Sequence, residues 1–116
     1  MPFKSPEAAL LDIRDNVRLA LEFVAGFDLH KFKADRRTVY AVTRCLEIIS
    51  EASRRLPASV KNRHPGIAWK DIAGAGNVYR HDYEDVSTAM VWNTVGALRE
   101  LVAAVEVELA ALKRDK

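Results

Sequence analysis

The sequence predicts an all-α fold in which four main helices form an antiparallel bundle. Apolar residues recur at intervals of three and four positions over long stretches, which is the spacing of one helix face. No stretch alternates apolar and polar residues as a strand does. Because 49% of the 116 residues are hydrophobic, we expect residues 1–116 to form one domain with a sizeable core.

The first helix is expected over about residues 6–25. Ser5 can cap its start, Pro6 suits the first helical position, and Gly26 is of the residue type that commonly ends helices. Its apolar face is predicted from five positions, namely Leu10, Ile13, Val17, Leu21 and Val24.

The second helix is expected to run from a cap at Asp35 to the break at Pro57. Residues 27–34, before it, are expected to form a connection in which Leu29 and Phe32 point inward. The apolar face of the second helix is broad, which predicts packing against more than one neighbour. Its main positions are Val39, Val42, Leu46, Ile49 and Leu56.

A third, shorter helix is expected over Trp69–Arg80, after a proline-rich connection with room for one helical turn at residues 59–63. Asp85 is expected to cap the fourth and longest helix, over about residues 86–114, which would span roughly 43 Å. That length is large for one small bundle, so we expect part of its apolar face to pack on a second copy of the chain. This face consists of Val91, Val95, Leu98, Val102, Val105, Leu109 and Leu112.

The composition favours a cytoplasmic protein. No apolar run approaches the roughly 20 residues that a membrane span requires, and the first residues do not resemble a signal peptide. The single Cys45 cannot form an internal disulfide, which fits a reducing compartment. Since Cys45 lies in an apolar helical pattern, we expect it to pack in the core rather than to act as a nucleophile.

Charge is distributed unevenly along the chain. From His30 to His81 there are eleven Lys and Arg residues against four acidic ones, a net +7, and the remainder carries −5. A basic middle suits a polyanionic partner. Helices with mixed charges on solvated faces would give the same count, so the charge pattern alone does not decide between these interpretations.

The stretch Trp69–Tyr83 holds most of the side chains suited to chemistry. Gly74 and Gly76 indicate either that backbone or another chain approaches closely there, or that the helix is locally weak. Arg44 and Glu51 share one face of the second helix, where they would form surface salt bridges or line a cleft. The candidate site residues in the stretch are Asn77, Arg80, His81, Asp82 and Tyr83.

These residue types suit cleavage of an RNA phosphodiester. The reaction needs a group that takes the proton from the ribose 2′-OH, a cation for the charge developing on phosphorus, and a proton donor for the leaving oxygen. His81 can transfer protons near neutral pH, Arg80 can grip phosphate, and Asn77 or Tyr83 could orient a phosphate oxygen. On chemistry alone, His81 and Tyr83 could equally do no more than cap and anchor the end of the third helix.

Neither a metal nor a cofactor is expected. His81, Asp82 and Glu84 are adjacent but do not form a pair of the HExxH type on one helical face. His30 and His64 lie on distant connections. The sequence has no P-loop and no dinucleotide fingerprint.

Over about residues 6–112 the chain resembles the HepT-like toxins of the HEPN superfamily (higher eukaryote and prokaryote nucleotide-binding proteins). The most specific segments are AVTRCLEIISEA at 41–52, IAWKDIAG at 67–74 and NVYRHDY at 77–83. That family has an E-A pair in its second helix, like Glu51-Ala52, and a tryptophan before a signature of the form RNxxxHxY. The residues that match this signature are Asn77, His81 and Tyr83.

The resemblance implies a homodimeric helical bundle with metal-independent endoribonuclease activity on RNA. It also implies a partner nucleotidyltransferase antitoxin that can attach AMP to the signature tyrosine, here Tyr83. A symmetric dimer would double the single histidine of the site. We expect the third helix and its glycines to lie near the two-fold axis.

One position departs from the family pattern. The signature arginine should fall at position 76, where this chain has Gly76. Arg80 can stand in if the helix is still regular there, because four residues turn a helix by about 400° and side chains lean toward its N-terminus. The alternative to an active enzyme is therefore a catalytically inactive dimer that binds a nucleotidyltransferase or nucleic acid.

Overall fold

The computed structural model describes residues 5–81 and 85–115, with side chains for 5–75 and 88–115. All regular structure in this part of the chain is helical, which confirms the all-α fold class. The helices are α1 (Glu7–Phe23), α2 (Leu29–Ala34), α3 (Arg36–Arg55), α4 (Ala58–Asn62), α5 (Trp69–His81), α6 (Asp85–Gly96) and α7 (Leu98–Arg114).

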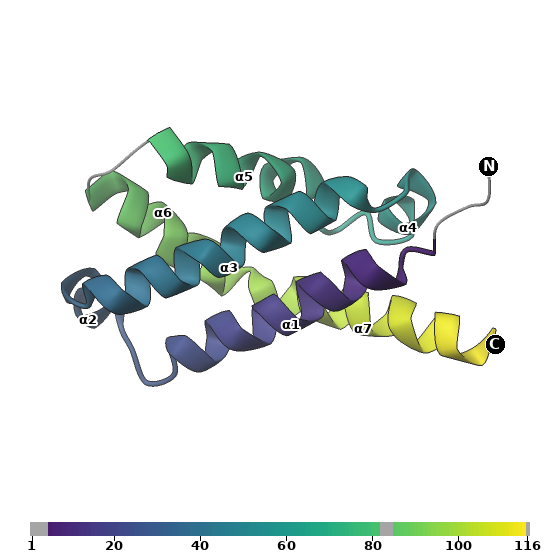
Figure 1. Cartoon of the computed structure of the whole chain (residues 1–116), viewed down its shortest axis with the longest axis horizontal. Coiled ribbons are helices and arrows are strands. Elements are labelled where there is room, and N and C mark those ends of the chain that lie inside the picture. Colours follow the sequence, from purple (N-terminus) through teal and green to yellow (C-terminus); the bar gives the residue numbers. More distant parts are fainter. Residues whose placement is uncertain (1–4, 82–84, 116) are drawn as a thin grey trace.

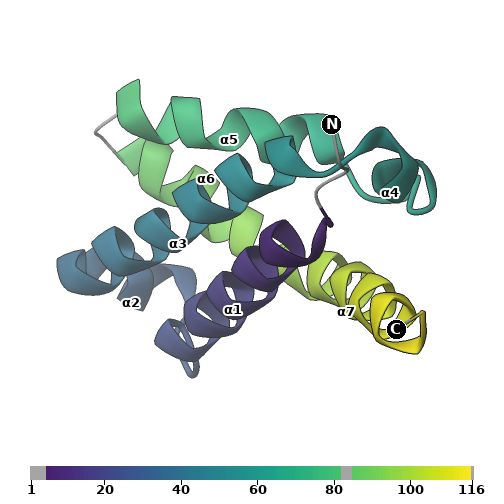
Figure 2. The same cartoon turned by 45° about the vertical axis from the view of Figure 1, so that its right-hand side comes forward.

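The longer helices form the expected antiparallel bundle with α3 at its centre (Figure 1). The helix α1 packs along one side of α3 and α5 along another, and both run opposite to α3. The helix α7 packs against α1, while α6 contacts α2 and α3 (Figures 1 and 2). The breadth of the apolar face on α3 therefore has the predicted cause, since three long helices pack against it.

Most of the core comes from the apolar faces that the periodicity predicts, but on α7 Leu101 is fully buried and the predicted Val102 is only partly buried. Burying a valine, leucine, isoleucine or phenylalanine side chain stabilises the fold by about 1.5–3 kcal/mol. Cys45 is also buried and packs in this core, as expected. The largest fully buried apolar side chains are Leu10, Ile13, Val17, Phe32, Val42, Ile49, Val91, Leu98, Leu101 and Val105.

Local signals set the helix boundaries. The hydroxyl of Ser5 accepts a hydrogen bond of 3.2 Å from the backbone N–H of Glu7, where α1 begins. Gly26, beyond its end, adopts a φ of 80°, which glycine reaches without steric cost. Asp35 caps α3 by accepting from the N–H of Thr38 at 3.1 Å, and this bond lowers the pKa of Asp35.

The connection after α1 contains a short helix, α2, that the sequence prediction missed. Asp28 caps it by accepting from the N–H of Lys31 at 2.8 Å. Phe32 is fully buried as predicted, and its ring centroid lies 5.1 Å from that of Trp92 on α6. The prediction that Leu29 points inward is wrong, since 37% of this residue is exposed. Only one side of so short a helix meets the bundle, and Phe32 occupies it.

The single fourth helix expected over residues 86–114 is wrong, because the chain breaks at Gly96-Ala97 into α6 and α7. The hydroxyl of Thr94 donates to the carbonyl of Met90 at 2.9 Å, a bond that tends to bend helices. The N–H of Ala97 then bonds the carbonyl of Thr94 at 3.0 Å, which closes the tighter turn of a helix end. Glycine at the break lowers the cost of leaving the helix.

The break removes the length argument for a second copy of the chain. The protein measures 46 × 28 × 23 Å, and the apolar face shared by α6 and α7 packs inside it. Val91, Val95, Leu98 and Val105 are buried, and the other positions of that face are partly buried against the same core. Among the described residues, no helix combines the length and apolar character that crossing a membrane requires.

Candidate functional site

The helix α5 carries the first half of the candidate motif. Its backbone is helical to His81, one residue further than predicted, so the helix is regular at Arg80. The geometric condition for Arg80 to follow Gly76 on nearly the same face is therefore met by the backbone. The side chains of Asn77, Arg80 and His81, and the whole of Asp82 and Tyr83, lie outside the described residues.

Two side chains of α3 fix the position of α5. The buried hydroxyl of Ser50 donates to the backbone carbonyl of Ala73 at 2.8 Å. The guanidinium of Arg54 donates to the same carbonyl at 2.5 Å and to the Ser50 hydroxyl at 3.1 Å. A carbonyl oxygen has two lone pairs, so it can accept from both of these donors. Sequence analysis missed this clamp, which holds α5 one turn before Asn77.

The start of α5 has its own anchor. The indole N–H of Trp69 donates to the backbone carbonyl of His64 at 3.1 Å, and the rest of the ring packs against the core. A buried indole needs such a partner for its N–H. The tryptophan that precedes the motif therefore fixes where the helix enters the bundle.

No close approach occurs at Gly74 within the described part of the chain. A Cβ added there would meet no atom within 4 Å. The backbone remains helical through both glycines of α5, so they do not break it. Approach of another chain and a locally weak helix, two interpretations offered by the sequence, both remain predictions.

Arg44 and Glu51 are both exposed on α3. Glu51 accepts a bond of 3.0 Å from Arg55, which also donates to Asp12 of α1 at 2.8 Å. The surface salt bridge expected for this face is thus present for Glu51. Arg44 forms no ion pair with any described acidic residue, and its place in a cleft remains a prediction.

A buried carboxylate ties the connection before α5 to α7. Glu108 is only 6% exposed and accepts two bonds from Arg63, at 2.6 and 3.0 Å, and its oxygen lies 2.7 Å from Nε2 of His64. The bonds from Arg63 hold the pKa of Glu108 below its ordinary value. Sequence analysis missed this cluster. Its signal was Glu108, a glutamate on the buried face of α7.

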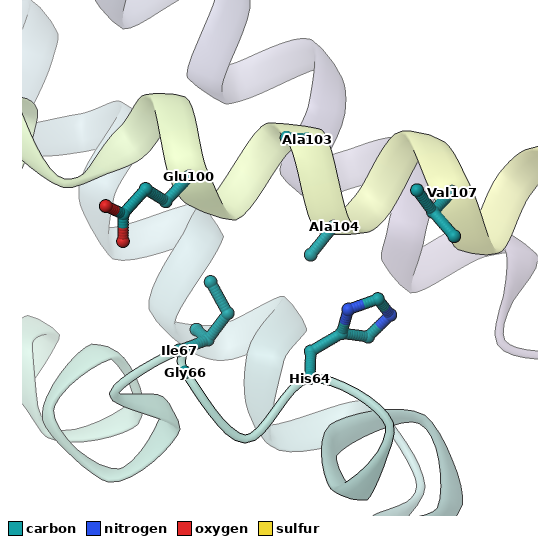
Figure 3. A pocket seen from close by; sticks show the side chains of 7 residues that line it. All are labelled: His64, Gly66, Ile67, Glu100, Ala103, Ala104 and Val107. Carbon is teal, nitrogen blue, oxygen red and sulfur yellow. The ribbon is translucent and has the colours of Figure 1, made fainter.

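A shallow hollow of 360 Å³ lies beside this cluster, between the connection and α7 (Figure 3). Its lining is mostly apolar, with Ile67 facing Ala104 across it. Since the His64 ring already contacts Glu108, the cluster has a structural role, which is to tie the connection before α5 to α7.

The other nucleophile and metal-ligand candidates have ordinary surroundings. Burial raises the pKa of the Cys45 thiol, which disfavours the reactive thiolate. His30 is exposed on α2, far along the chain from His64. Among residues 5–75 and 88–115, whose side chains the structure describes, no group of three or more His, Cys, Asp or Glu is arranged to hold a metal ion.

Comparison with known proteins identifies relatives of this chain. The family model described as ribonuclease HepT-like matches residues 13–108. A protein of Thermococcus cleftensis named "Probable ribonuclease HepT" is 36% identical over 92 residues, which cover 79% of this chain and 84% of that one. A Caldanaerobacter subterraneus protein named "Putative RNase" is 30% identical over 113 residues, 97% of this chain and 99% of that one.

No solved structure matches the chain in the same kind of comparison. The family match spans α3, α5 and the candidate motif at residues 77–83. The helical fold, the sequence motif and these relatives agree, and the chain belongs to the HepT-like ribonuclease family.

Proposed function

We propose that this protein is a metal-independent endoribonuclease and the toxin of a toxin–antitoxin pair. The match of residues 13–108 to a ribonuclease family is the observation that carries the reaction class. His81 is the proposed acid and base, Arg80 the phosphate clamp, and Asn77 a supporting donor. The helical backbone of α5 as far as His81 supports Arg80 as the substitute for the missing arginine at Gly76.

In the proposed reaction, the ribose 2′-oxygen attacks phosphorus while the bond from phosphorus to the 5′-oxygen breaks. A histidine takes the 2′-OH proton, and a histidine returns a proton to the leaving oxygen. The guanidinium of Arg80 stabilises the charge that builds up on the phosphoryl oxygens. This scheme uses only groups of the chain itself.

The proposed assembly is a homodimer in which two copies of α5 face each other. The open space around Gly74 supports this arrangement, because a second backbone could approach closely there. Two copies of His81 would then supply both proton roles. Light scattering at micromolar concentration tests this assembly, and a monomer mass would contradict the paired site.

The proposed partner is a nucleotidyltransferase that attaches AMP to Tyr83. The added phosphate would place negative charge beside Arg80 and His81, where it would compete with the RNA backbone. Expression of the chain with and without the adjacent nucleotidyltransferase, reading growth and RNA integrity, tests the toxin–antitoxin role. Equal growth and intact RNA in both cultures would contradict it.

A second function is favoured by one observation, the glycine at position 76. If Arg80 does not replace the missing cation, the protein is an inactive dimer that binds a nucleotidyltransferase or nucleic acid. Purified protein that forms a complex with the partner but cuts no RNA at any concentration would support this alternative.

A further inference from the structure

A row of cationic and aromatic side chains begins α3. Arg36, Tyr40 and Arg44 are spaced four residues apart, so each step turns about 40° beyond a full circle and the three share one face. Arg37 lies beside them. All four are exposed, and Tyr40 is 68% exposed, more than any other large hydrophobic residue described. We call these four residues the α3 cationic stripe.

The stripe is long enough to contact more than one charged group of a polyanion. Its outer arginines, Arg36 and Arg44, are separated by about 12 Å along the helix axis. The guanidinium carbon of Arg36 lies 6.0 Å from the centroid of the Tyr40 ring. Arg36, Arg37 and Tyr40 also line an open hollow of 490 Å³. An aromatic ring is therefore flanked on one helix face by charged groups.

The stripe's arginines, like Arg99 and Arg114, have no carboxylate partner among the described residues. Asp35 is the one acid between residues 30 and 44, against five Lys and Arg, and its carboxylate caps α3. The arginines that do pair with carboxylates are Arg14, Arg18, Arg55 and Arg63.

The fold places the stripe at the end of the bundle that holds the candidate site. Because α3 and α5 are antiparallel, the start of α3 lies at the end where α5 finishes and α6 begins (Figures 1 and 2). The Phe32–Trp92 contact joins α2 and α6 at the same end. A strand bound along the start of α3 would therefore extend toward the motif.

We propose that the α3 cationic stripe binds single-stranded RNA, with its arginines on phosphates and Tyr40 stacked on a base. The inference rests on the proposed ribonuclease function and extends the substrate site onto α3. Arginine forks match phosphate oxygens, and an exposed aromatic ring can stack only on a base that is not held in a duplex. An acidic protein surface would use the charges but would not need the ring.

Three variants test the stripe. Arg36→Gln with Arg37→Gln removes two charges, Tyr40→Ala removes the ring, and Lys113→Gln with Arg114→Gln is the control. The control removes two exposed charges from the end of α7, at the opposite end of the bundle (Figure 1). The probe is a labelled single-stranded RNA whose 2′-O-methyl riboses prevent cleavage, and its anisotropy is measured at several salt concentrations.

Loss of two phosphate contacts should reduce the slope of log affinity against log salt by about 1.4. Tyr40→Ala should weaken binding of the single strand on the order of tenfold and leave binding of the same sequence as a duplex unchanged. The control should keep the wild-type slope within about 0.3, less than half of one contact. This combination of results would support RNA binding by the stripe.

Two results would overturn the stripe proposal without contradicting the ribonuclease function. If wild-type protein cuts unmodified RNA and both stripe variants bind the probe like wild type, the stripe is not the substrate site. Heparin serves as a polyanion without bases. If Tyr40→Ala binds the probe like wild type, and the arginine variant loses affinity for heparin and for RNA equally, the surface binds any polyanion and the stacking role is wrong. If wild type neither binds nor cuts RNA, both proposals fall together.

Discussion

Replacing Ser50 by alanine should loosen α5 from α3 without disturbing the rest of the bundle. Ser50 is only 1% exposed, and its hydroxyl donates to the Ala73 carbonyl at 2.8 Å. A buried hydrogen bond of this kind contributes about 1 kcal/mol net. With an unfolding entropy of about 2.1 cal/mol/K per residue, the loss corresponds to a fall in Tm of about 4 °C.

The matched control is Ser53→Ala. Ser53 is equally buried on the same helix, but its hydroxyl donates to the carbonyl of Ser50, within α3 itself. The exchange rates of the α5 backbone amides distinguish the two variants. Amides of α5 should exchange about fivefold faster in Ser50→Ala, which is 1 kcal/mol of local opening, and at the wild-type rate in Ser53→Ala.

Function supplies a second measurement for the same pair of variants. If α5 carries the cleaving residues, Ser50→Ala should lower the rate of RNA cleavage and Ser53→Ala should leave it nearly unchanged. Two results would refute the clamp: α5 exchange equal to wild type in Ser50→Ala, or the same acceleration in both variants. Either would mean that the Ser50 hydroxyl is not needed to position α5, and that Arg54, Trp69 and apolar packing suffice.

Three further predictions concern the motif and the Glu108 cluster. His81→Ala should abolish RNA cleavage while the circular dichroism spectrum stays helical, and Arg80→Ala should lower the rate by about 10²–10³, the usual effect of losing one charge-stabilising donor; unchanged cleavage in Arg80→Ala would refute its role at the Gly76 position. Incubation with the adjacent nucleotidyltransferase and ATP should add AMP-sized mass that disappears in Tyr83→Phe, and modified protein that still cuts RNA would contradict the switch. Because bonds from Arg63 lower the pKa of Glu108, its carboxylate stabilises the fold above the pKa of an unfolded glutamate, and that stabilisation is lost as pH falls through the lower folded value. The Tm difference between wild type and Glu108→Gln should therefore be largest at neutral pH, begin to shrink near the ordinary glutamate pKa of about 4.3, and disappear only below the lower folded pKa, whereas Glu106→Gln, which removes an exposed pair with Arg18, should change Tm little at any pH.

The helix class and most boundaries could be predicted from the sequence because their causes are local. Periodic apolar residues must face one side of a helix, and Asp35, Gly26 and Pro57 act on the backbone within a few residues of themselves. The burial of Phe32 and Cys45 follows from the same local patterns. The family signature is also a short-range feature, so the reaction class could be inferred from residues 77–83 before the fold was known.

The fold also decided features that no single segment contains. Continuous periodicity did not reveal the break at Gly96-Ala97, because two helices that meet at an angle can share one apolar face. The clamp of Ser50 and Arg54 on Ala73 joins positions 19 to 23 residues apart, and the bond between Arg63 and Glu108 joins positions 45 apart. Such pairings depend on how helices pack, which residue spacing along one helix does not specify.

The same division applies to the candidate site. The sequence by itself determined which residues are suited to the chemistry, since the near-neutral titration of an unperturbed histidine, the permanent charge of arginine and the hydroxyl of tyrosine belong to the residue types. Only the tertiary structure brought the start of α3 to the end of the bundle where α5 finishes, because antiparallel packing joins those ends. The shared end of the bundle thus follows from helix direction, a property of the folded bundle.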